Sequence, residues 1–144
     1  MQVLNGEIGI VFGAGGNLDE FNPSGFSPTP DPNSRWSEAR VAELLFRLPP
    51  LRQDPRFTVD VSPYLADGRI VGQECWIFLN GLFVLHQAIT THTELTFELA
   101  REAINPRPQR LSFALPNAAS PRDLGIGNDL RLLGLAFGRL RLQR

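Results

Sequence analysis

The chain has 144 residues, about the length of one domain, and a domain of this size buries roughly two thirds of its unfolded surface without disulfide or metal crosslinks. Fourteen basic residues, all of them arginine, balance fifteen acidic ones, and the net charge of −1 argues against a protein that binds nucleic acid by neutralising phosphates. We therefore expect one domain over residues 1–144 and no nucleic-acid partner.

The only cysteine, Cys75, lies in an apolar run, so no intramolecular disulfide can form and we expect a buried, unreactive thiol. The N-terminus lacks the basic and apolar regions of a signal peptide. No stretch approaches the length of apolar sequence that a membrane span needs. These features predict a cytoplasmic protein without membrane insertion.

Strands are predicted along most of the chain. Residues 7–12 form the first, and apolar side chains then recur at every second position in residues 42–48, 57–61, 95–99 and 111–115. This alternation is typical of a strand with one face on a core and the other toward water. The prolines lie at the ends of these runs, where they do not interrupt a ladder of hydrogen bonds.

The clearest hairpin joins residues 70–79 to residues 82–85 through Asn80-Gly81. Asn-Gly supplies the two positive φ angles that a type I′ turn requires. Residues 94–105 could also form a helix, but threonine and phenylalanine favour a strand there. We therefore predict a strand, with a helical turn at residues 100–104.

A long polar turn at residues 117–129 leads into a last strand over residues 131–142. Leu133, Leu135 and Phe137 share one face of that strand, whereas Leu140 and Leu142 have the opposite parity; all five can be buried only if a bulge near Gly138 absorbs one residue. About eight strands and almost no helix predict an all-β fold, a two-sheet antiparallel β-sandwich of jelly-roll-like type.

The longest irregular segment is a loop over residues 13–35, and loops of this length usually carry function. Phe21 and Phe26 should anchor it to the body of the domain. At its end stand Arg35, Trp36 and Glu38. An indole beside charged groups can stack under a sugar ring and bind its hydroxyls, so we predict a ligand site. The predicted set is Arg35, Trp36 and Glu38 with Asn17 and Asp19 from the loop.

Ordinary structural roles are the alternatives for both tryptophans. A tryptophan that enters a strand, as Trp36 does, most often caps the end of a sandwich core, and Trp76, which stands in a run of apolar residues, is expected inside the core.

Two groups of residues could bind metal. Asp123, Asn128 and Asp129, together with Asn117, offer oxygen ligands for a structural calcium ion, although the same residue types also close turns with their own side chains. His86, His92 and Glu94 could hold a transition metal. The alternative for this second group is a set of solvent-facing polar residues around a hairpin.

Several short motifs, in their order and spacing, resemble a small β-sandwich accessory domain found in or beside bacterial surface-glycan glycosyltransferases. The segments that carry the resemblance are Gly25-Phe26-Ser27, Arg35-Trp36-Ser37, residues 42–49, residues 71–81, residues 120–125 and residues 129–136. The resemblance implies a non-catalytic module that binds carbohydrate or docks onto a glycan-synthesising enzyme, with no catalytic residues to carry over.

Three functions follow from this sequence, in order of preference. The first is a non-catalytic carbohydrate-binding or glycosyltransferase-accessory module in bacterial glycan assembly, with no cofactor apart from the calcium ion considered above. The second is a structural jelly-roll protein that forms a homo-oligomer through its sheet edges. The third is a metal-dependent, cupin-like enzyme.

Overall fold

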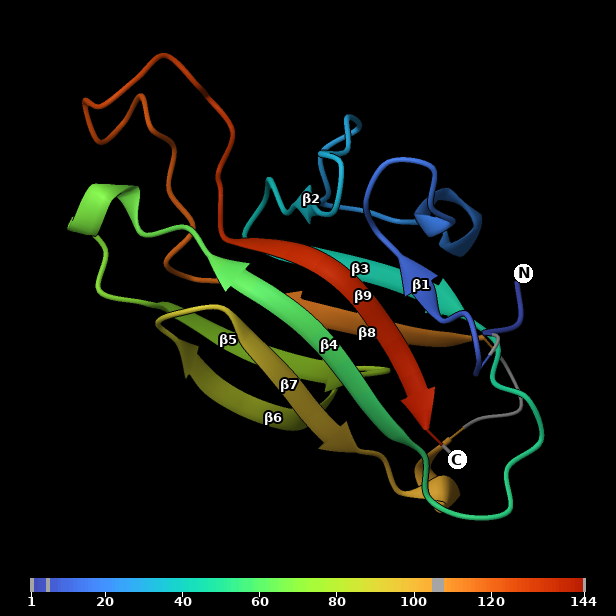
Figure 1. Ribbon diagram of the computed structural model, residues 1–144. Helices are drawn as coiled ribbons and strands as arrows, with labels where there is room; N and C mark the ends of the chain where they lie inside the picture. The colour runs from blue at the N-terminus through green and yellow to red at the C-terminus, as the bar shows by residue number, and fades with distance from the viewer. Residues whose placement is uncertain (1, 5, 105–107, 144) are drawn as a thin grey trace.

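The structure, a computed structural model, describes residues 2–4, 6–104 and 108–143 (Figure 1). These residues form two antiparallel sheets and three short 3₁₀ helices. One sheet has the order β1–β9–β4–β7, with β2 also paired to β9: β1 (Ile10–Val11), β2 (Arg35–Trp36), β4 (Arg56–Pro63), β7 (Thr93–Glu98) and β9 (Leu135–Gln143). The other has the order β3–β8–β5–β6: β3 (Val41–Phe46), β5 (Gln73–Leu79), β6 (Leu82–Ile89) and β8 (Gln109–Ala114). The 3₁₀ helices are η1 (Leu18–Phe21), η2 (Ala66–Gly68) and η3 (Arg101–Ala103).

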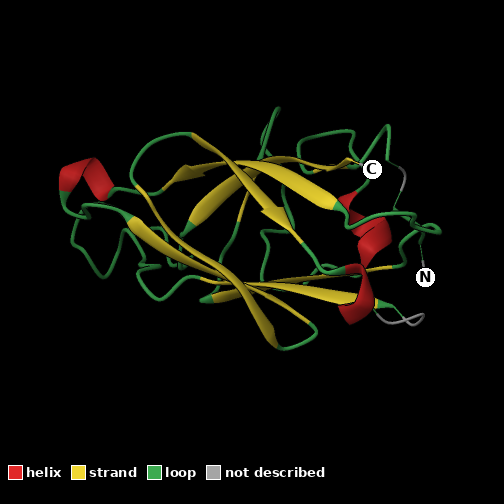
Figure 2. Cartoon of the chain, turned by 90° about the horizontal axis from the view of Figure 1, so that it is seen from below, coloured by secondary structure: helices red, strands yellow, loops and turns green. Residues whose placement is uncertain are grey.

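The strand pairs are nested along the chain. β5 pairs with β6, β4 with β7, β3 with β8 and β2 with β9, and every pair is antiparallel. The chain is therefore a long hairpin rolled up so that successive pairs alternate between two layers, which Figure 2 shows one above the other. This is the jelly-roll arrangement. The predicted fold class, an all-β antiparallel sandwich, is confirmed.

The core lies between the two sheets and is rich in phenylalanine. Phe57 stacks on Phe97 with ring centroids 5.4 Å apart, and the edge of Phe113 meets Phe137 at 5.0 Å across the gap between the layers. Each of these rings is buried, as is Leu44. Burial of such a side chain stabilises the fold by roughly 1.5–3 kcal/mol. The every-second-residue pattern thus identified the inward faces of the strands correctly.

Cys75 is also inside this core, with 1% of its surface exposed. Burial raises the pKa of its thiol to about 12, because the thiolate would lose its hydration. The expected buried position of this residue is confirmed.

The last strand contains the predicted bulge. Val59 of β4 faces Leu140 of β9, whereas Val61 faces Phe137. Two residues of β9, Gly138 and Arg139, therefore lie opposite the single residue Asp60 of β4. The Asp60 carboxylate accepts a hydrogen bond from the backbone N–H of Arg139 at 2.7 Å. The extra residue switches the parity of the strand, so Leu135 and Phe137 before the bulge and Leu140 and Leu142 after it are all buried, as is Leu133 just ahead of β9.

The predicted hairpin is confirmed as well. Asn80 and Gly81 have φ angles of 52° and 84°, the two positive values of a type I′ turn. The Asn80 side chain also accepts a hydrogen bond from the N–H of Arg110 at 2.8 Å, which ties the turn to β8. Strand β6 runs further than expected, to Ile89.

Other element boundaries differ from the predictions. The first strand contains only two residues, because Gly9 before it has a φ of +69° and its backbone lies against the carbonyl of Leu140. Residues 94–104 contain most of strand β7 followed by η3, as predicted, and residue 105 lies outside the described residues. No helix within residues 2–4, 6–104 and 108–143 is long and apolar enough to cross a membrane.

Candidate functional site

The loop over residues 13–35 is fixed to the body of the protein. Phe21 and Phe26 are both buried in the core, which confirms their predicted anchoring role. Ser24 exchanges two backbone hydrogen bonds with Glu43 of β3, at 3.0 and 2.8 Å. The loop therefore covers the outer edge of β3.

Arg35, the first residue of the predicted loop site, has only 7% of its surface exposed. Its guanidinium donates to the carbonyl oxygens of Phe12 and Ser27 at 3.1 and 3.2 Å, and it forms an ion pair with Asp19 at 3.6 Å. Arg35 thus holds the two ends of the loop together, and the structure does bring Asp19 to it as predicted.

Asn17 lies in the same loop, but its side chain bonds to the backbone around β1 and not to Arg35. Its side-chain oxygen accepts from the N–H of Val11 at 2.8 Å, and its amide nitrogen donates to the carbonyl of Gly9 at 3.0 Å. These bonds close the turn after β1. Asn17 therefore stabilises the backbone of that turn.

Trp36 is partly buried, and its ring meets the edge of Tyr64 at a centroid distance of 6.1 Å. The hydroxyl of Tyr64 is buried and has no hydrogen-bond partner among the described residues. Burial raises the pKa of Tyr64, and the charges of Asp67 and Asp129 raise it further.

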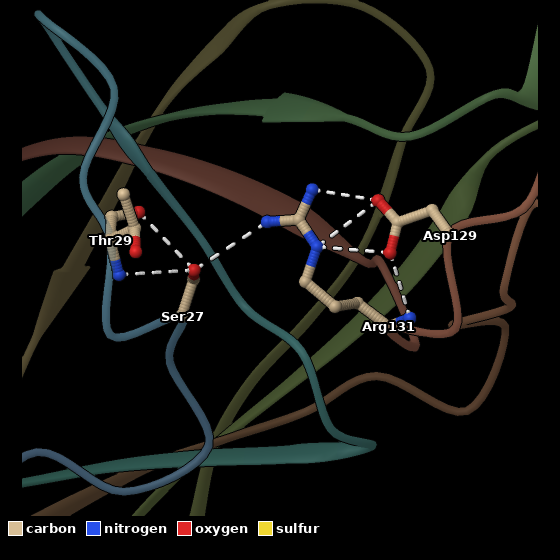
Figure 3. A network of polar contacts seen from close by, with 4 residues as sticks. All are labelled: Ser27, Thr29, Asp129 and Arg131. Atoms are coloured by element: carbon tan, nitrogen blue, oxygen red, sulfur yellow. Dashed lines mark hydrogen bonds and ion pairs between the residues drawn. The ribbon is translucent and has the colours of Figure 1, made fainter.

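Arg131 joins the loop over residues 13–35 to the turn that precedes β9, as Figure 3 shows. Its guanidinium binds both carboxylate oxygens of Asp129, at 2.7 to 3.1 Å, and reaches the hydroxyl of Ser27 at 3.5 Å. The hydrogen bonds from Arg131 hold the pKa of Asp129 below its ordinary value. The pKa of Arg131 is raised by Asp129 and, to a smaller extent, by Glu38.

We call this group the loop-end cluster. It consists of Ser27, Trp36, Glu38, Tyr64, Asp129 and Arg131. It combines the predicted residues Trp36 and Glu38 with an ion pair that the sequence did not associate with them. Its ion pair and hydrogen bonds join two loops, and binding of a ligand there stays a prediction.

The side chains predicted to bind calcium either make hydrogen bonds to other groups of the protein or are exposed. The Asp129 carboxylate is held by Arg131, and the side-chain oxygen of Asn117 accepts from the N–H of Glu74 at 2.8 Å. Asp123 and Asn128 are exposed. A cation at Asp129 would have to displace a guanidinium that already neutralises the carboxylate.

The predicted transition-metal group is not assembled. His92 bonds through Nδ1 to the hydroxyl of Ser62 at 2.7 Å, and His86 bonds through Nε2 to a carboxylate oxygen of Glu74 at 2.5 Å. Among the residues that the structure describes, no three His, Cys, Asp or Glu side chains lie together as metal ligands would. His86, His92 and Glu94 therefore form no common centre.

Trp76 was expected in the core, and this prediction is wrong. Strand β5 buries every second side chain, from Gln73 to Leu79, and Trp76 belongs to the opposite set. The indole is 38% exposed on the outer face of the four-stranded sheet. Because the residues that follow Glu74 in β5 are all apolar, the alternation of this strand could not be recognised in the sequence. Its outward positions are Glu74, Trp76 and Phe78.

Strand register places these outward side chains in two rows across the sheet. One row is Val41, Ala114, Trp76 and His86; the next is Glu43, Ser112, Phe78 and Phe83. Rows two residues apart are separated by about 7 Å. Glu74 stands beyond the first row, next to Ala88. We call this surface the Trp76 face.

The two faces of the indole have different neighbours. On the β6 side, the His86 ring lies 4.1 Å from the indole, centroid to centroid, and Phe83 lies at 5.9 Å. On the β8 side, the opposing residue is Ala114, whose side chain is a single methyl group, and beyond it is Val41. The indole is thus supported on one side and borders a low apolar shelf on the other.

Polar groups border this shelf. In the second row the Glu43 carboxylate accepts a hydrogen bond from the Ser112 hydroxyl at 2.7 Å. Glu74 stands on the other side of the first row, where it pairs with His86. The flat indole can stack against the apolar face of a sugar. The carboxylates of Glu43 and Glu74, one on either side of its row, can accept hydrogen bonds from the sugar hydroxyls.

No protein-family model matches the sequence, and no curated protein is detectably similar to it. Among solved structures, the chain is similar to a carbohydrate-binding module, CBM36, in complex with calcium and xylotriose, with a TM-score of 0.45, 11% identity, and coverage of 84% of this chain and 87% of that one. It is also similar to CBM51 from Clostridium perfringens GH95 in complex with methyl-galactose, with a TM-score of 0.43, 14% identity, and coverage of 94% and 80%. At this level of similarity, neither complex assigns a ligand or a site to the present chain.

Proposed function

We propose that the chain is a non-catalytic carbohydrate-binding domain and that its binding surface is the Trp76 face. The observation that carries this proposal is the exposed indole of Trp76, which has His86 against one side and only Ala114 beside the other. A pyranose ring can lie on the shelf of Ala114 and Val41 with its C–H face against the indole.

The indole is already oriented before a ligand arrives. Its contacts with His86 and Phe83 limit its rotamers, so binding need not order it. Ordering a mobile side chain costs about 0.5–1.5 kcal/mol, and a supported ring avoids that cost. This preorganisation favours a binding role for Trp76 over that of an incidental exposed aromatic residue.

The charges around the indole favour neutral sugars. Glu43 and Glu74 stand on either side of the first row, and His86 is the only basic group in the two rows. Carboxylates accept hydrogen bonds from sugar hydroxyls but repel uronic or sialic acids. We therefore propose neutral oligosaccharides as the ligand class.

The resemblance to accessory domains of surface-glycan glycosyltransferases supports a more specific role. In that role the Trp76 face would hold a growing or finished glycan while a partner enzyme acts on it. The loop-end cluster, which lies on different strands and loops, is then free to contact the partner. Deletion of the gene in a bacterium that encodes it, followed by analysis of its surface polysaccharide, tests this part of the proposal.

A glycan array with neutral and acidic oligosaccharides tests the binding function itself. We expect binding to neutral glycans and its loss in Trp76→Ala, with a melting temperature close to that of the unchanged protein because the side chain is partly exposed. Trp36→Ala is the matched control, and it should retain binding. Binding lost in Trp36→Ala and retained in Trp76→Ala would move the site to the loop-end cluster.

A further inference from the structure

The edge strands of the two sheets, β1, β2, β3, β6 and β7, differ in how their free edges are protected. The outer edge of β3 is covered, because Ser24 bonds to Glu43 and Gln2 accepts from the N–H of Arg47 at 3.0 Å. Strands β1 and β2, which lie on the same side of β9, are each only two residues long. Strand β7 carries two exposed glutamates, Glu94 and Glu98. Covering, shortness and charge are the usual devices that stop a sheet edge from pairing with another chain.

Apart from one bulge near its start, strand β6 has little of this protection. It is eight residues long, contains no proline, and His86 is its only ionisable residue. Among the residues that the structure describes, no backbone hydrogen bond joins its outer side to another segment. Leu82 and Phe83 at its start are 64% and 59% exposed. A long, apolar and uncharged free edge is a template for strand addition.

A bulge limits the usable length of this edge. Ile77 of β5 faces Leu85, whereas Phe78 faces Phe83, so Val84 is an extra residue that bends β6 near the hairpin turn. From Leu85 to Ile89 the pairing with β5 is uninterrupted. The regular part of the edge therefore consists of five residues with Gln87 at the centre.

We propose that two copies of this chain pair through β6, antiparallel and about a twofold axis at Gln87, to join their four-stranded sheets into one sheet of eight strands. An antiparallel twofold pairing is self-complementary, because each residue meets in the partner the residue that meets it. The absence of charge suits self-pairing: in this register His86 faces the small Ala88 of the second copy, and no like charges oppose one another.

The pairing has a consequence for ligand binding that rests on the proposed function. Trp76 lies on β5, one strand in from β6, so three interstrand spacings separate the two indoles. With the two-residue stagger that this register gives, the two indoles lie about 16 Å apart, on one continuous surface. A dimer would therefore present two Trp76 faces side by side to a polysaccharide. Two linked sites can raise apparent affinity by about 10² or more without any new contact.

Size-exclusion chromatography with light scattering on the full chain, from about 1 μM to about 1 mM, tests the pairing. We expect the mass to approach twice the 16.0 kDa of one chain as concentration rises. Gln87→Lys should hold the mass at that of a monomer, since two ammonium groups would meet at the twofold axis. Thr96→Lys, which adds the same charge to exposed β7, is the control and should still dimerise.

A crosslink tests the register. Gln87→Cys should form a disulfide-linked dimer under mild oxidation, because residues paired across the axis lie within disulfide reach, whereas the native Cys75 is buried. Thr96→Cys should not crosslink. A monomer at every concentration, or a dimer unaffected by Gln87→Lys, would overturn the proposal.

The two proposals can fail separately. Dimers that bind no glycan would remove the proposed function and leave the pairing intact. Monomers that bind glycans would remove the proposed pairing and leave the proposed function intact. If both hold, Gln87→Lys should bind a soluble oligosaccharide as well as the unchanged protein but bind an immobilised polysaccharide at least about tenfold more weakly.

Discussion

The imidazole of His86 packs against the indole of Trp76, with ring centroids 4.1 Å apart and ring planes inclined by 34°. The two residues are direct neighbours on adjacent strands, and His86 is itself held by Glu74. This contact supports the tryptophan on one side, and its register neighbour on the other side is the small Ala114. Strand parity places the indole on the outer face of the sheet, and its ring contacts with His86 and Phe83 limit its rotamers there.

The first prediction concerns this support. His86→Ala should lower the free energy of unfolding by less than about 1 kcal/mol, since it removes one exposed cross-strand pair. Glycan affinity should fall about two- to tenfold, because the indole must then be ordered by the ligand. Isothermal titration calorimetry measures the affinity. His86→Phe should restore it, and an affinity unchanged in His86→Ala would show that the stack has no role in binding.

The second prediction assigns Arg35 a role in stability. Its guanidinium is buried and donates to two backbone carbonyls, so Arg35→Ala should cost about 2–3 kcal/mol of unfolding free energy, measured by urea denaturation. Arg56→Ala is the control, because its ion pair with Glu98 is exposed and should contribute less than about 1 kcal/mol. Equal losses in the two variants would contradict this assignment.

The third prediction concerns the bulge in β9. A Cβ on Gly138 would lie 2.1 Å from a carboxylate oxygen of Asp60, so Gly138→Ala must displace the group that caps the N–H of Arg139. We expect a loss of about 1–3 kcal/mol in thermal or urea unfolding. Gly127→Ala, where the nearest atom lies 3.4 Å away, should change stability much less. A fully stable Gly138→Ala would mean that the strand does not pair as described.

The fourth prediction is a pH dependence. Arg131 lowers the pKa of Asp129 in the folded protein below its ordinary value of 3.8. The stabilisation that this ion pair contributes is therefore fully present above the pKa that Asp129 has in the unfolded chain. It is lost as the pH falls through the lower pKa of Asp129 in the folded protein. Urea denaturation between about pH 6 and pH 2.5 should show Asp129→Asn less stable by up to about 1 kcal/mol at the upper end. The difference should vanish at the lower end; a difference that grew on acidification would have the wrong sign.

The sequence predicted the fold because two-layer sandwiches bury every second side chain, and this periodicity survives in the sequence wherever the other face is polar. The bulge at Gly138 was predictable for the same reason, since a change of parity within one apolar strand has few other solutions. The short β1 was not predictable, because Gly9 ends the strand through a close approach to Leu140 that only the folded chain reveals.

The exposure of Trp76 was not predicted, and the reason lies in the composition of β5. Ile77 points inward and Phe78 points outward, so both faces of β5 carry apolar side chains. The segment therefore looked like a continuous apolar run, in which a tryptophan is normally buried. Glu74, two residues before Trp76, was the one signal that this parity faces water. Sequence separation also hid the loop-end cluster, where Ser27 and Arg131 meet only because the jelly roll brings two distant loops to the same place.

The proposed binding surface requires that Trp76 contacts the sugar, and the chain has two tryptophans, so each can be observed alone. Fluorescence titrations with neutral oligosaccharides such as cellotetraose, xylotetraose and mannotetraose would be run on Trp36→Phe, where Trp76 is the only reporter, and on Trp76→Phe. We expect a saturable change in emission in Trp36→Phe with at least one of these sugars and none in Trp76→Phe. A saturable change seen only in Trp76→Phe would contradict the account.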